Sequence, residues 1–387
     1  CMGMLLFGVS LITLGSVAPS ISAKFQLNEL SAGTLFSILP LGILTGSLLF
    51  GPICDKYGYK ALLVLSCILL FCGFQAIAHA ASHHLLTPFI FLFGLAGGVI
   101  NGATSAVVAD ISRENKKAKL SLLGVFFAIG ALGMPFILGT LEDRFSFEAI
   151  VSSISALPLA IALFFLFTQF PPAKQAQGVS IKQGVGLLKD DVLILIAFFL
   201  FCQSSFEGII NNWTTTYLLD QFSVEKSSAL YALSLYVTGM AVMRLLIGSV
   251  LKNISSKHLL YLSFGLLLLG AVLLKAGFSF GMAVAGLVLL GAGLAAGFPV
   301  MLSFVGDRYA AISGTAFSFV LAVALLGNML VNYLMGIVAN AYGAHHLTTV
   351  VFAEIILMVV LSAFILRKVF ITPKKQKTNE VIETMAQ

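Results

Sequence analysis

The chain has 387 residues, with 22 Lys or Arg, 16 Asp or Glu and a formal net charge of +6, and its mean hydropathy is +1.03. Charged residues make up 10% of the chain and hydrophobic residues 59%, whereas about a quarter of a soluble domain is charged, so this composition excludes an ordinary soluble enzyme. The small net charge gives no basic patch for nucleic acid, and the five cysteines form no CxxC pair that would indicate a metal site or a disulfide framework.

Twelve long apolar runs follow one another along the chain, separated by polar residues, glycines and prolines. A helix that spans a membrane needs about 20 apolar residues, and each run is close to that length. The sequence therefore predicts an all-α membrane protein of twelve transmembrane helices, in which the first run is a helix rather than a signal peptide because no basic leader precedes it. The predicted spans are residues 2–23, 31–53, 60–79, 86–109, 119–140, 149–169, 192–218, 226–251, 258–279, 282–305, 312–338 and 347–368.

The runs divide into two sets of six around residues 171–191, the longest polar stretch between runs. When the second set is shifted by 197 positions, seven residues of the two halves align without a gap. A duplicated helical unit is typical of secondary transporters, and we expect pseudo-symmetry between the halves. The aligned pairs are Gly42 and Gly239, Gly51 and Gly248, Gly73 and Gly270, Gly94 and Gly291, Gly130 and Gly327, Gly139 and Gly336, and Asp110 and Asp307.

These observations predict four parts of the chain: an N-terminal six-helix bundle (1–170), a cytoplasmic linker (171–191), a C-terminal six-helix bundle (192–368) and a polar tail (369–387). Within the linker, residues 181–188 are amphipathic enough for a short helix on the membrane surface. We expect a monomer whose partners are the lipid bilayer, a small solute and protons.

The loops give the orientation. Seventeen of the 22 basic residues fall in the linker, the tail and the loops that follow even-numbered runs, four lie on the opposite side and Arg244 lies within a span. Because basic loops stay in the cytoplasm, we predict a multi-pass protein of the cell membrane with both termini cytoplasmic.

A charged loop after the second run carries the most specific pattern in the chain. It resembles the Gly-x-x-x-Asp-(Arg/Lys)-x-Gly-x-(Arg/Lys) signature of the major facilitator superfamily, and the resemblance implies a transporter of two six-helix halves. The glycines permit close helix contact and a tight turn, and the aspartate can meet a helix N-terminus or a basic side chain. We expect such contacts to hold the halves together on the cytoplasmic side. The marked residues are Gly51, Asp55, Lys56, Gly58 and Lys60.

Three stretches are similar, within the superfamily, to the fucose permease and sugar:proton symporter branch: residues 97–110, 126–135 and 206–218. This resemblance implies a central cavity that binds a sugar and is coupled to protons. The chain has Ser105 where that branch usually has Asn and Gly124 where it often has His, and the first run has no carboxylate. Asp110 lies at the end of the fourth run. We assign it, together with the loop motif, to the gate on the cytoplasmic side.

Glu207 is the candidate proton carrier. It lies about 15 residues into the seventh run, roughly 22 Å from the predicted cytoplasmic end and near mid-membrane. An ionisable group at that depth costs about 2.5–3.5 kcal/mol and marks a functional site by default. Gln203, Glu207 and Asn211 recur every four residues and so share one helical face. The alternative is a protonated Glu207 that only ties helices together by hydrogen bonds.

Other polar residues in the spans are candidates for the solute cavity. Asn101 and Ser105 in the fourth run, and Asn328 and Asn332 in the eleventh, repeat the four-residue spacing. Hydrogen bonding between helices is the competing explanation for each. Trp213, the single tryptophan, could offer a platform to a sugar ring or lie in the interfacial aromatic belt.

Arg244 lies low in the eighth run, roughly 10 Å from its cytoplasmic end, and a direct ion pair with Glu207 is not expected. We expect Arg244 to pair with Asp307 as part of a gate, or to extend to the interface. Glu354 in the last run has no evident partner and is interpreted as a hydrogen-bonded peripheral carboxyl.

No phosphate-binding loop or hydrolytic motif is present in the sequence, so we expect no enzyme activity and no cofactor. The first hypothesis is a proton-coupled transporter of a small polar solute, a sugar, that works by alternating access. The second is a drug/proton antiporter of the same superfamily, because residues 130–139 carry a Gly/Pro pattern close to that of antiporters.

The orientation can be tested with accessibility probes. A reporter fused after Gln387 is expected in the cytoplasm, and a Ser82→Cys substitution in a cysteine-free variant is expected to react with an impermeant thiol reagent added to intact cells, because 17 of the 22 basic residues fall on one side. Reaction at position 82 only after permeabilisation would overturn this orientation.

Overall fold

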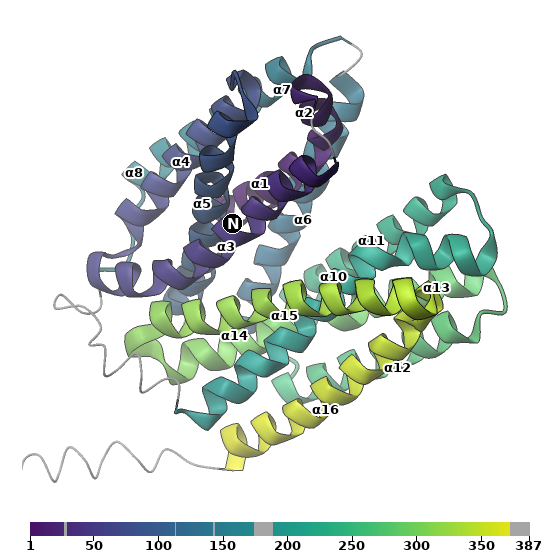
Figure 1. Cartoon of the computed structure of the whole chain (residues 1–387). Helices are drawn as coiled ribbons and strands as arrows, with labels where there is room; N and C mark the ends of the chain where they lie inside the picture. The colour runs from purple at the N-terminus through teal and green to yellow at the C-terminus, as the bar shows by residue number, and fades with distance from the viewer. Residues whose placement is uncertain (27–28, 113, 142–143, 174–188, 372–387) are drawn as a thin grey trace, which may run out of the picture.

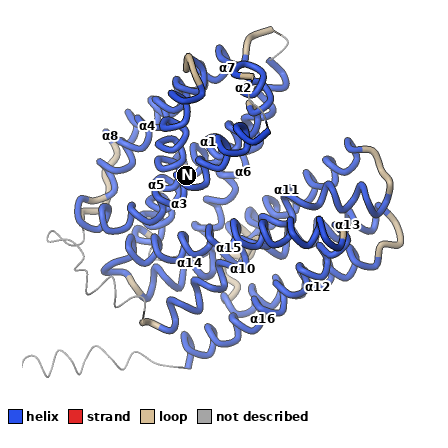
Figure 2. The backbone as a smooth tube through the Cα atoms, viewed as in Figure 1, coloured by secondary structure: helices blue, strands red, loops and turns tan. Residues whose placement is uncertain are grey.

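The computed structural model describes residues 1–26, 29–112, 114–141, 144–173 and 189–371, which are helix or loop with no strand (Figure 2). Residues 181–188 and the polar tail beyond residue 371 lie outside the described residues. The helices are α1 (Met2–Ser16), α2 (Ala18–Phe25), α3 (Glu29–Tyr57), α4 (Tyr59–His79), α5 (His83–Ile111), α6 (Lys116–Leu141), α7 (Phe147–Ile154), α8 (Ala156–Phe167), α10 (Asp191–Phe222), α11 (Lys226–Gly248), α12 (Ser256–Ala276), α13 (Phe280–Leu294), α14 (Gly297–Arg308), η1 (Ala310–Ile312), α15 (Ser313–Tyr342), η2 (Ala344–His346) and α16 (Leu347–Ile371).

The all-α membrane fold is confirmed. Among the described residues, eleven spans are long and apolar enough to cross a membrane, and they coincide with eleven of the twelve predicted runs. The remaining run, at the start of the chain, forms the apolar α1 of 15 residues followed by α2.

Three predicted runs are interrupted rather than continuous. The first divides into α1 and α2, the sixth into α7 and α8, and the tenth into α13 and α14. In each case the second segment has a proline at its second or third position, at Pro19, Pro158 and Pro299. A proline ring clashes with the carbonyl of the preceding turn, which favours a break before it and a restart with proline in the first turn. Proline alone does not decide the break, because α3 continues through Pro40 and Pro52 and α5 through Pro88.

The helices form two groups, α1 to α8 and α10 to α16, which Figure 1 shows as the purple-to-blue and the teal-to-yellow parts of the molecule. Within the first group α3 packs on α5 and α1 on α6; within the second α11 packs on α13 and α10 on α15. The second group thus repeats the pairing of the first, as the predicted two six-helix halves require.

Glycines make the repeat visible at atomic level. Gly42 of α3 lies against the carbonyl oxygen of Phe91, and Gly239 of α11 lies against that of Val288. All four residues obey the 197-position offset. In each pair the helix backbones touch where the glycine has no side chain.

The reciprocal contact is also duplicated. Gly94 meets the carbonyl oxygen of Leu39, and Gly291 meets that of Tyr236, again 197 positions apart. A Cβ atom at either glycine would lie too close to the facing backbone oxygen for any van der Waals contact. The aligned glycines are therefore helix-packing sites that both halves share.

This packing predicts a measurable asymmetry between two glycine substitutions. Gly291→Ala is expected to destabilise the protein by about 1–3 kcal/mol, because the methyl group meets fixed backbone rather than a movable side chain. Gly265→Ala in α12 is the matched control, since a Cβ there meets nothing within 4 Å, and alanine favours a helix by about 1 kcal/mol. Thermal unfolding in detergent compares them; equal midpoints would contradict the packing argument.

Candidate functional site

Asp55 joins the two halves by capping a helix of the opposite half. Its buried carboxylate accepts hydrogen bonds from the backbone N–H of Gly314 at 3.2 Å and of Thr315 at 2.9 Å, and from the Thr315 hydroxyl at 2.8 Å. These groups belong to the first turn of α15, whose free N–H groups and positive dipole end favour an anion. Gly51, one turn before Asp55, allows α3 to approach that turn.

The other residues of the loop motif lie outside this contact. Gly58 has a φ of +81° at the junction of α3 and α4, a left-handed conformation that glycine adopts without strain. Lys56 is exposed and lies over the Tyr57 ring at 5.0 Å, and Lys60 is exposed at the start of α4.

Two polar contacts between the halves are related by the repeat, and the first lies next to the cap. The Ser313 hydroxyl donates to Asp110 at 2.8 Å, and the Lys116 ammonium donates to Asp307 at 2.6 Å. Donors and acceptors of the two contacts are each 197 positions apart. The predicted partnership of Arg244 with Asp307 is therefore wrong, because Lys116 of the other half occupies that carboxylate.

A second duplicated pair lies deeper in the interface. The Ser318 hydroxyl donates to the carbonyl oxygen of Ser47, and the Ser121 hydroxyl donates to that of Arg244 at 2.8 Å. These positions also differ by 197. The two halves thus meet through a pseudo-symmetric set of polar contacts that the sequence analysis did not identify.

The pseudo-symmetry breaks at the cap. Lys252 stands at the position equivalent to Asp55, and it is exposed. The helix start equivalent to that of α15 belongs to α6, which begins Lys116-Lys117. A lysine cannot cap a helix N-terminus, because both carry positive charge. Of these two equivalent junctions, only the one between α3 and α15 has an acidic cap among the described residues.

Glu207 and Arg244 form an ion pair, which corrects the expectation that they would not meet. Arg244 Nη2 lies 3.6 Å from Glu207 Oε1, with the side chains 11% and 22% exposed. Heights along the helix axes take no account of the long arginine side chain, which carries the guanidinium away from its own backbone.

Gly124 of α6 makes room for this arginine. A Cβ at position 124 would lie 2.6 Å from Arg244 Cδ and 2.8 Å from its Nη1. The Arg244 side chain therefore crosses the surface of the first half while its guanidinium pairs with Glu207 of the second. Gly124 was noted in the sequence only as a departure from the sugar-transporter branch.

Gln203 contacts the same Glu207 oxygen as Arg244 does. Its amide nitrogen donates to Glu207 Oε1 at 3.1 Å and to the carbonyl oxygen of Leu294 at 2.7 Å. Leu294 is the last residue of α13, so the break before α14 leaves its carbonyl available. Gln203 is fully buried, and its Oε1 lies over Gly297. The Glu207 carboxylate thus contacts both a fixed amide and a guanidinium.

Four asparagines lie on α10 within two turns of Glu207 or on α15 against those turns. Asn328 donates to the carbonyl oxygen of Ser204 at 2.9 Å, Asn332 donates to that of Asn328 at 2.8 Å, and Asn212 donates to Asn332 Oδ1 at 2.9 Å. Asn211 bonds only its own helix, to the Glu207 carbonyl at 2.8 Å, and both Asn211 and Asn212 are exposed.

The structure thus connects Asn328 to α10 through the carbonyl oxygen of Ser204, and Asn332 through Asn212, a residue that the sequence analysis did not single out. Gly208 permits the contact, because a Cβ there would overlap the amides of Asn328 and Asn332. Trp213 is half-buried against Gly336 of α15, with Cζ2 3.5 Å from where a Cβ would stand.

The two candidates in α5 lie apart from the amide cluster. Ser105 is buried and Asn101 is half-buried, and within the described residues neither hydrogen bonds to α10 or α15. They belong to the first half, opposite the Glu207 side of the interface.

Glu354 has a partner, contrary to the sequence analysis. It is 5% exposed on α16 and accepts a hydrogen bond from the Ser205 hydroxyl of α10 at 2.7 Å. This contact joins two helices of one half, as the interpretation of a hydrogen-bonded carboxyl requires.

Asp190 is the ionisable group that starts α10 outside the membrane span. Burial favours a higher pKa for this carboxyl, but hydrogen bonds from the Tyr309 hydroxyl and from the N–H of Leu193, with the nearby charge of Arg308, hold the pKa below its usual value. The Asp190 side chain also accepts from Val192 N–H at 2.9 Å, so it is a stable N-cap.

Comparisons with known proteins identify the family and the fold. A family model described as "Major Facilitator Superfamily" matches residues 1–274 and 201–384. The 4-hydroxybenzoate transporter PcaK of Pseudomonas putida is 28% identical over 162 residues, 41% of this chain and 36% of that one. The multi-drug resistance efflux pump PmrA homolog of Lactococcus lactis is 23% identical over 250 residues, 63% of this chain and 60% of that one.

The fold is shared with a solved structure. A crystal structure of FucP in the outward conformation matches with a TM-score of 0.78 and 18% identity, covering 94% of this chain and 97% of that one. The same protein from E. coli is described as a fucose:proton symporter.

The cap on α15 gives a prediction about conformation. Asp55→Asn removes the charge and leaves one oxygen to accept hydrogen bonds, so the contact between the halves is expected to weaken by about 0.3–2 kcal/mol. Accessibility of the buried Cys54 thiol, which lies against Gly314, measures the result in a variant that lacks the other four cysteines, and it is expected to rise. Lys56→Gln, adjacent but outside the contact, is the control, and equal accessibility in the two variants would contradict the role of Asp55.

Proposed function

Because this chain belongs to the major facilitator superfamily, we propose that it is a secondary active transporter that moves a small polar solute, a sugar, across the cell membrane by alternating access, with protons coupled through Glu207. The observation that carries the proposal is the Glu207 carboxylate held by Gln203 and Arg244 beside the asparagine cluster. The protein acts as a monomer with both termini in the cytoplasm.

Coupling follows from the charges of the pair. Arginine keeps its charge at all physiological pH values, so Glu207 is the partner that can be neutralised. Protonation of Glu207 removes the attraction for Arg244. The backbone of Arg244 is hydrogen-bonded to Ser121 of the first half, and its side chain lies on Gly124 there. The proton at Glu207 therefore acts on the junction between the halves.

The chemistry of the neighbouring side chains supports a hydroxylated solute. Amides supply both donors and acceptors, and Asn211, Asn212, Asn328 and Asn332 lie within two turns of Glu207 or across from it. Trp213 supplies an aromatic face next to them. The fold neighbour FucP, described as a fucose:proton symporter, adds support for a sugar.

The second candidate is a drug/proton antiporter. The Gly/Pro pattern of residues 130–139 and the partial similarity to a multi-drug resistance efflux pump favour it. A lipophilic cation would be repelled by Arg244. Its binding would also remove water from the amide cluster without giving the amides new hydrogen bonds. A thermal-stability screen of purified protein with monosaccharides and amphiphilic cations separates the two candidates and identifies a solute for assay.

Glu207→Gln tests the coupling. Glutamine keeps the shape and the hydrogen bond with Gln203 but cannot take up a proton, so solute exchange at equal pH is expected to persist while accumulation driven by a pH gradient is lost. Proteoliposome uptake and counterflow measure the two activities. Glu354→Gln is the control, because Glu354 is a buried carboxyl bonded within one half, and it is expected to accumulate solute like the wild type.

Three outcomes are distinguishable. Full accumulation by the Glu207→Gln variant would remove Glu207 as the coupling site. Loss of both exchange and accumulation together with a lower unfolding temperature would indicate a structural carboxyl. Loss of accumulation in the Glu354→Gln variant alone would move the proton site to α16.

A further inference from the structure

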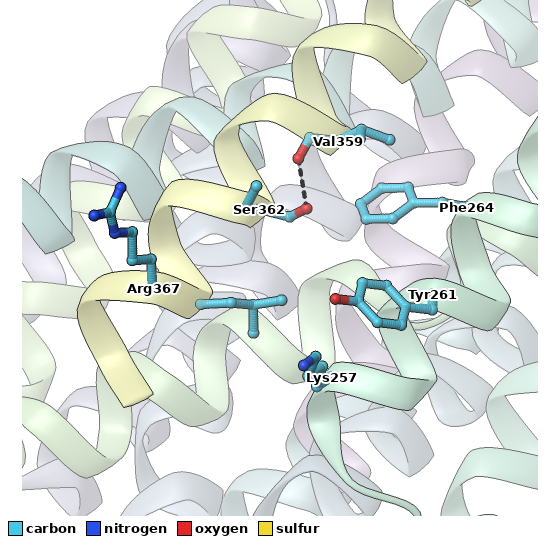
Figure 3. Close-up of a pocket in the computed structure, with 8 residues that line it drawn as sticks. Lys257, Tyr261, Phe264, Val359, Ser362 and Arg367 are labelled. Atoms are coloured by element: carbon cyan, nitrogen blue, oxygen red, sulfur yellow. Dashed lines mark hydrogen bonds between the residues drawn. The ribbon is translucent and has the colours of Figure 1, made fainter. Parts of the chain in front are cut away.

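A pocket outside the solute path lies between α12 and α16, on the side of the second half that faces away from the first (Figure 1). Its volume is about 570 Å³. Figure 3 shows Tyr261 and Phe264 of α12 facing Val359 and Ser362 of α16. Because the Ser362 side chain is small, it does not fill the space opposite the two aromatic rings, and a hollow remains.

Two cations border this pocket, one on each helix, and Figure 3 shows the Arg367 side chain extending away from Lys257. Lys257 is the second residue of α12, and Arg367 lies in the last two turns of α16. Both are exposed, and within the described part of the chain neither forms an ion pair. Lys257 instead lies over the Tyr261 ring, 5.7 Å from its centroid.

The rest of the pocket wall is apolar and reaches into the span. Phe264 is seven residues after Lys257 and Val359 eight before Arg367, so the wall extends roughly 10 Å from the cations. The Ser362 hydroxyl donates to the Val359 carbonyl at 2.8 Å and is occupied within its own helix. Tyr261 is 54% and Val359 40% exposed, so the pocket is open on the side where lipid lies.

The repeat offers a comparison within the molecule. Lys60 of α4, 197 positions before Lys257, lines a pocket beside the end of α8. The residue equivalent to Arg367 is Phe170, so that pocket has one cation where the α12–α16 pocket has two. The paired cations are a property of the second half alone.

We propose that the α12–α16 pocket binds an anionic phospholipid, with the phosphate between Lys257 and Arg367 and an acyl chain along Tyr261, Phe264 and Val359. A guanidinium forms paired hydrogen bonds with phosphate oxygens and an ammonium adds a point charge. Basic pockets between transmembrane helices at the cytoplasmic side bind such head groups. A water-soluble phosphate would not use the apolar wall.

The test measures lipid retention by native mass spectrometry of the full-length, delipidated protein in detergent, titrated with phosphatidylglycerol or phosphatidylcholine. Wild type is expected to prefer phosphatidylglycerol. The double variant Lys257→Gln/Arg367→Gln is expected to bind it about thirty-fold more weakly, which corresponds to about 2 kcal/mol, and each single variant about fivefold. The control variant Lys119→Gln/Lys252→Gln also loses two exposed cations, outside the pocket, and is expected to bind like wild type.

Equal weakening in the two double variants would overturn the proposal, because it would show general surface attraction. Equal retention of the two lipids by wild type would overturn it as well. A third arm adds glycerol 1-phosphate, which is expected not to compete; competition would assign the cations to a soluble phosphate compound. If the double variant unfolds at a lower temperature without lipid, the single variants decide the result.

Discussion

The contact between the Asp55 carboxylate and the first turn of α15 is the interaction on which the arrangement of the two halves depends. It combines a buried charge, two backbone N–H groups and a hydroxyl. Burying a carboxylate without such partners would cost several kcal/mol of free energy. The Asp55 carboxylate can therefore stay buried only while α3 and α15 keep their present alignment. The close approach at Gly51 and the deeper Ser318 hydrogen bond fix the same two helices. Separating the halves exposes all of these groups at once.

Arg244 connects the other junction, between α6 and α11, to the centre of the second half. Its carbonyl accepts from Ser121, its side chain lies on Gly124, and its guanidinium pairs with Glu207. One residue therefore contacts both halves and the candidate proton site. Gln203 contacts the same oxygen of that carboxylate and is itself held by the carbonyl at the end of α13. A change of charge at Glu207 therefore acts on both Arg244 and Gln203.

Much of this could be predicted from the sequence, because spacing along a helix determines which residues share a face. The 197-position offset, found on glycines, also relates the serine and aspartate contacts between the halves. The repeat could have identified Lys116 as the partner of Asp307, had Ser313 been known to meet Asp110. The Arg244–Glu207 pair could not be found this way, because the length of the arginine side chain and an opposing glycine decide it. The prolines at positions 158 and 299 are present in the sequence, but hydropathy gives only the length of an apolar run. It does not show that the helix is interrupted near these prolines.

The lysine at position 252 has a mechanical consequence. An exact duplication would give two equal junctions, one on each side of the pseudo-symmetry axis. The two halves would then separate equally at both junctions. Here the α3–α15 junction has an anion at a helix start, whereas the α6–α11 junction has a cluster of positive charge at the equivalent place. We therefore expect the α6–α11 junction to open first and the α3–α15 junction to serve as the pivot. On this expectation, opening toward the basic side is a rotation about α3 and α15, with the path of the proposed solute past α6 and α11, beside Arg244.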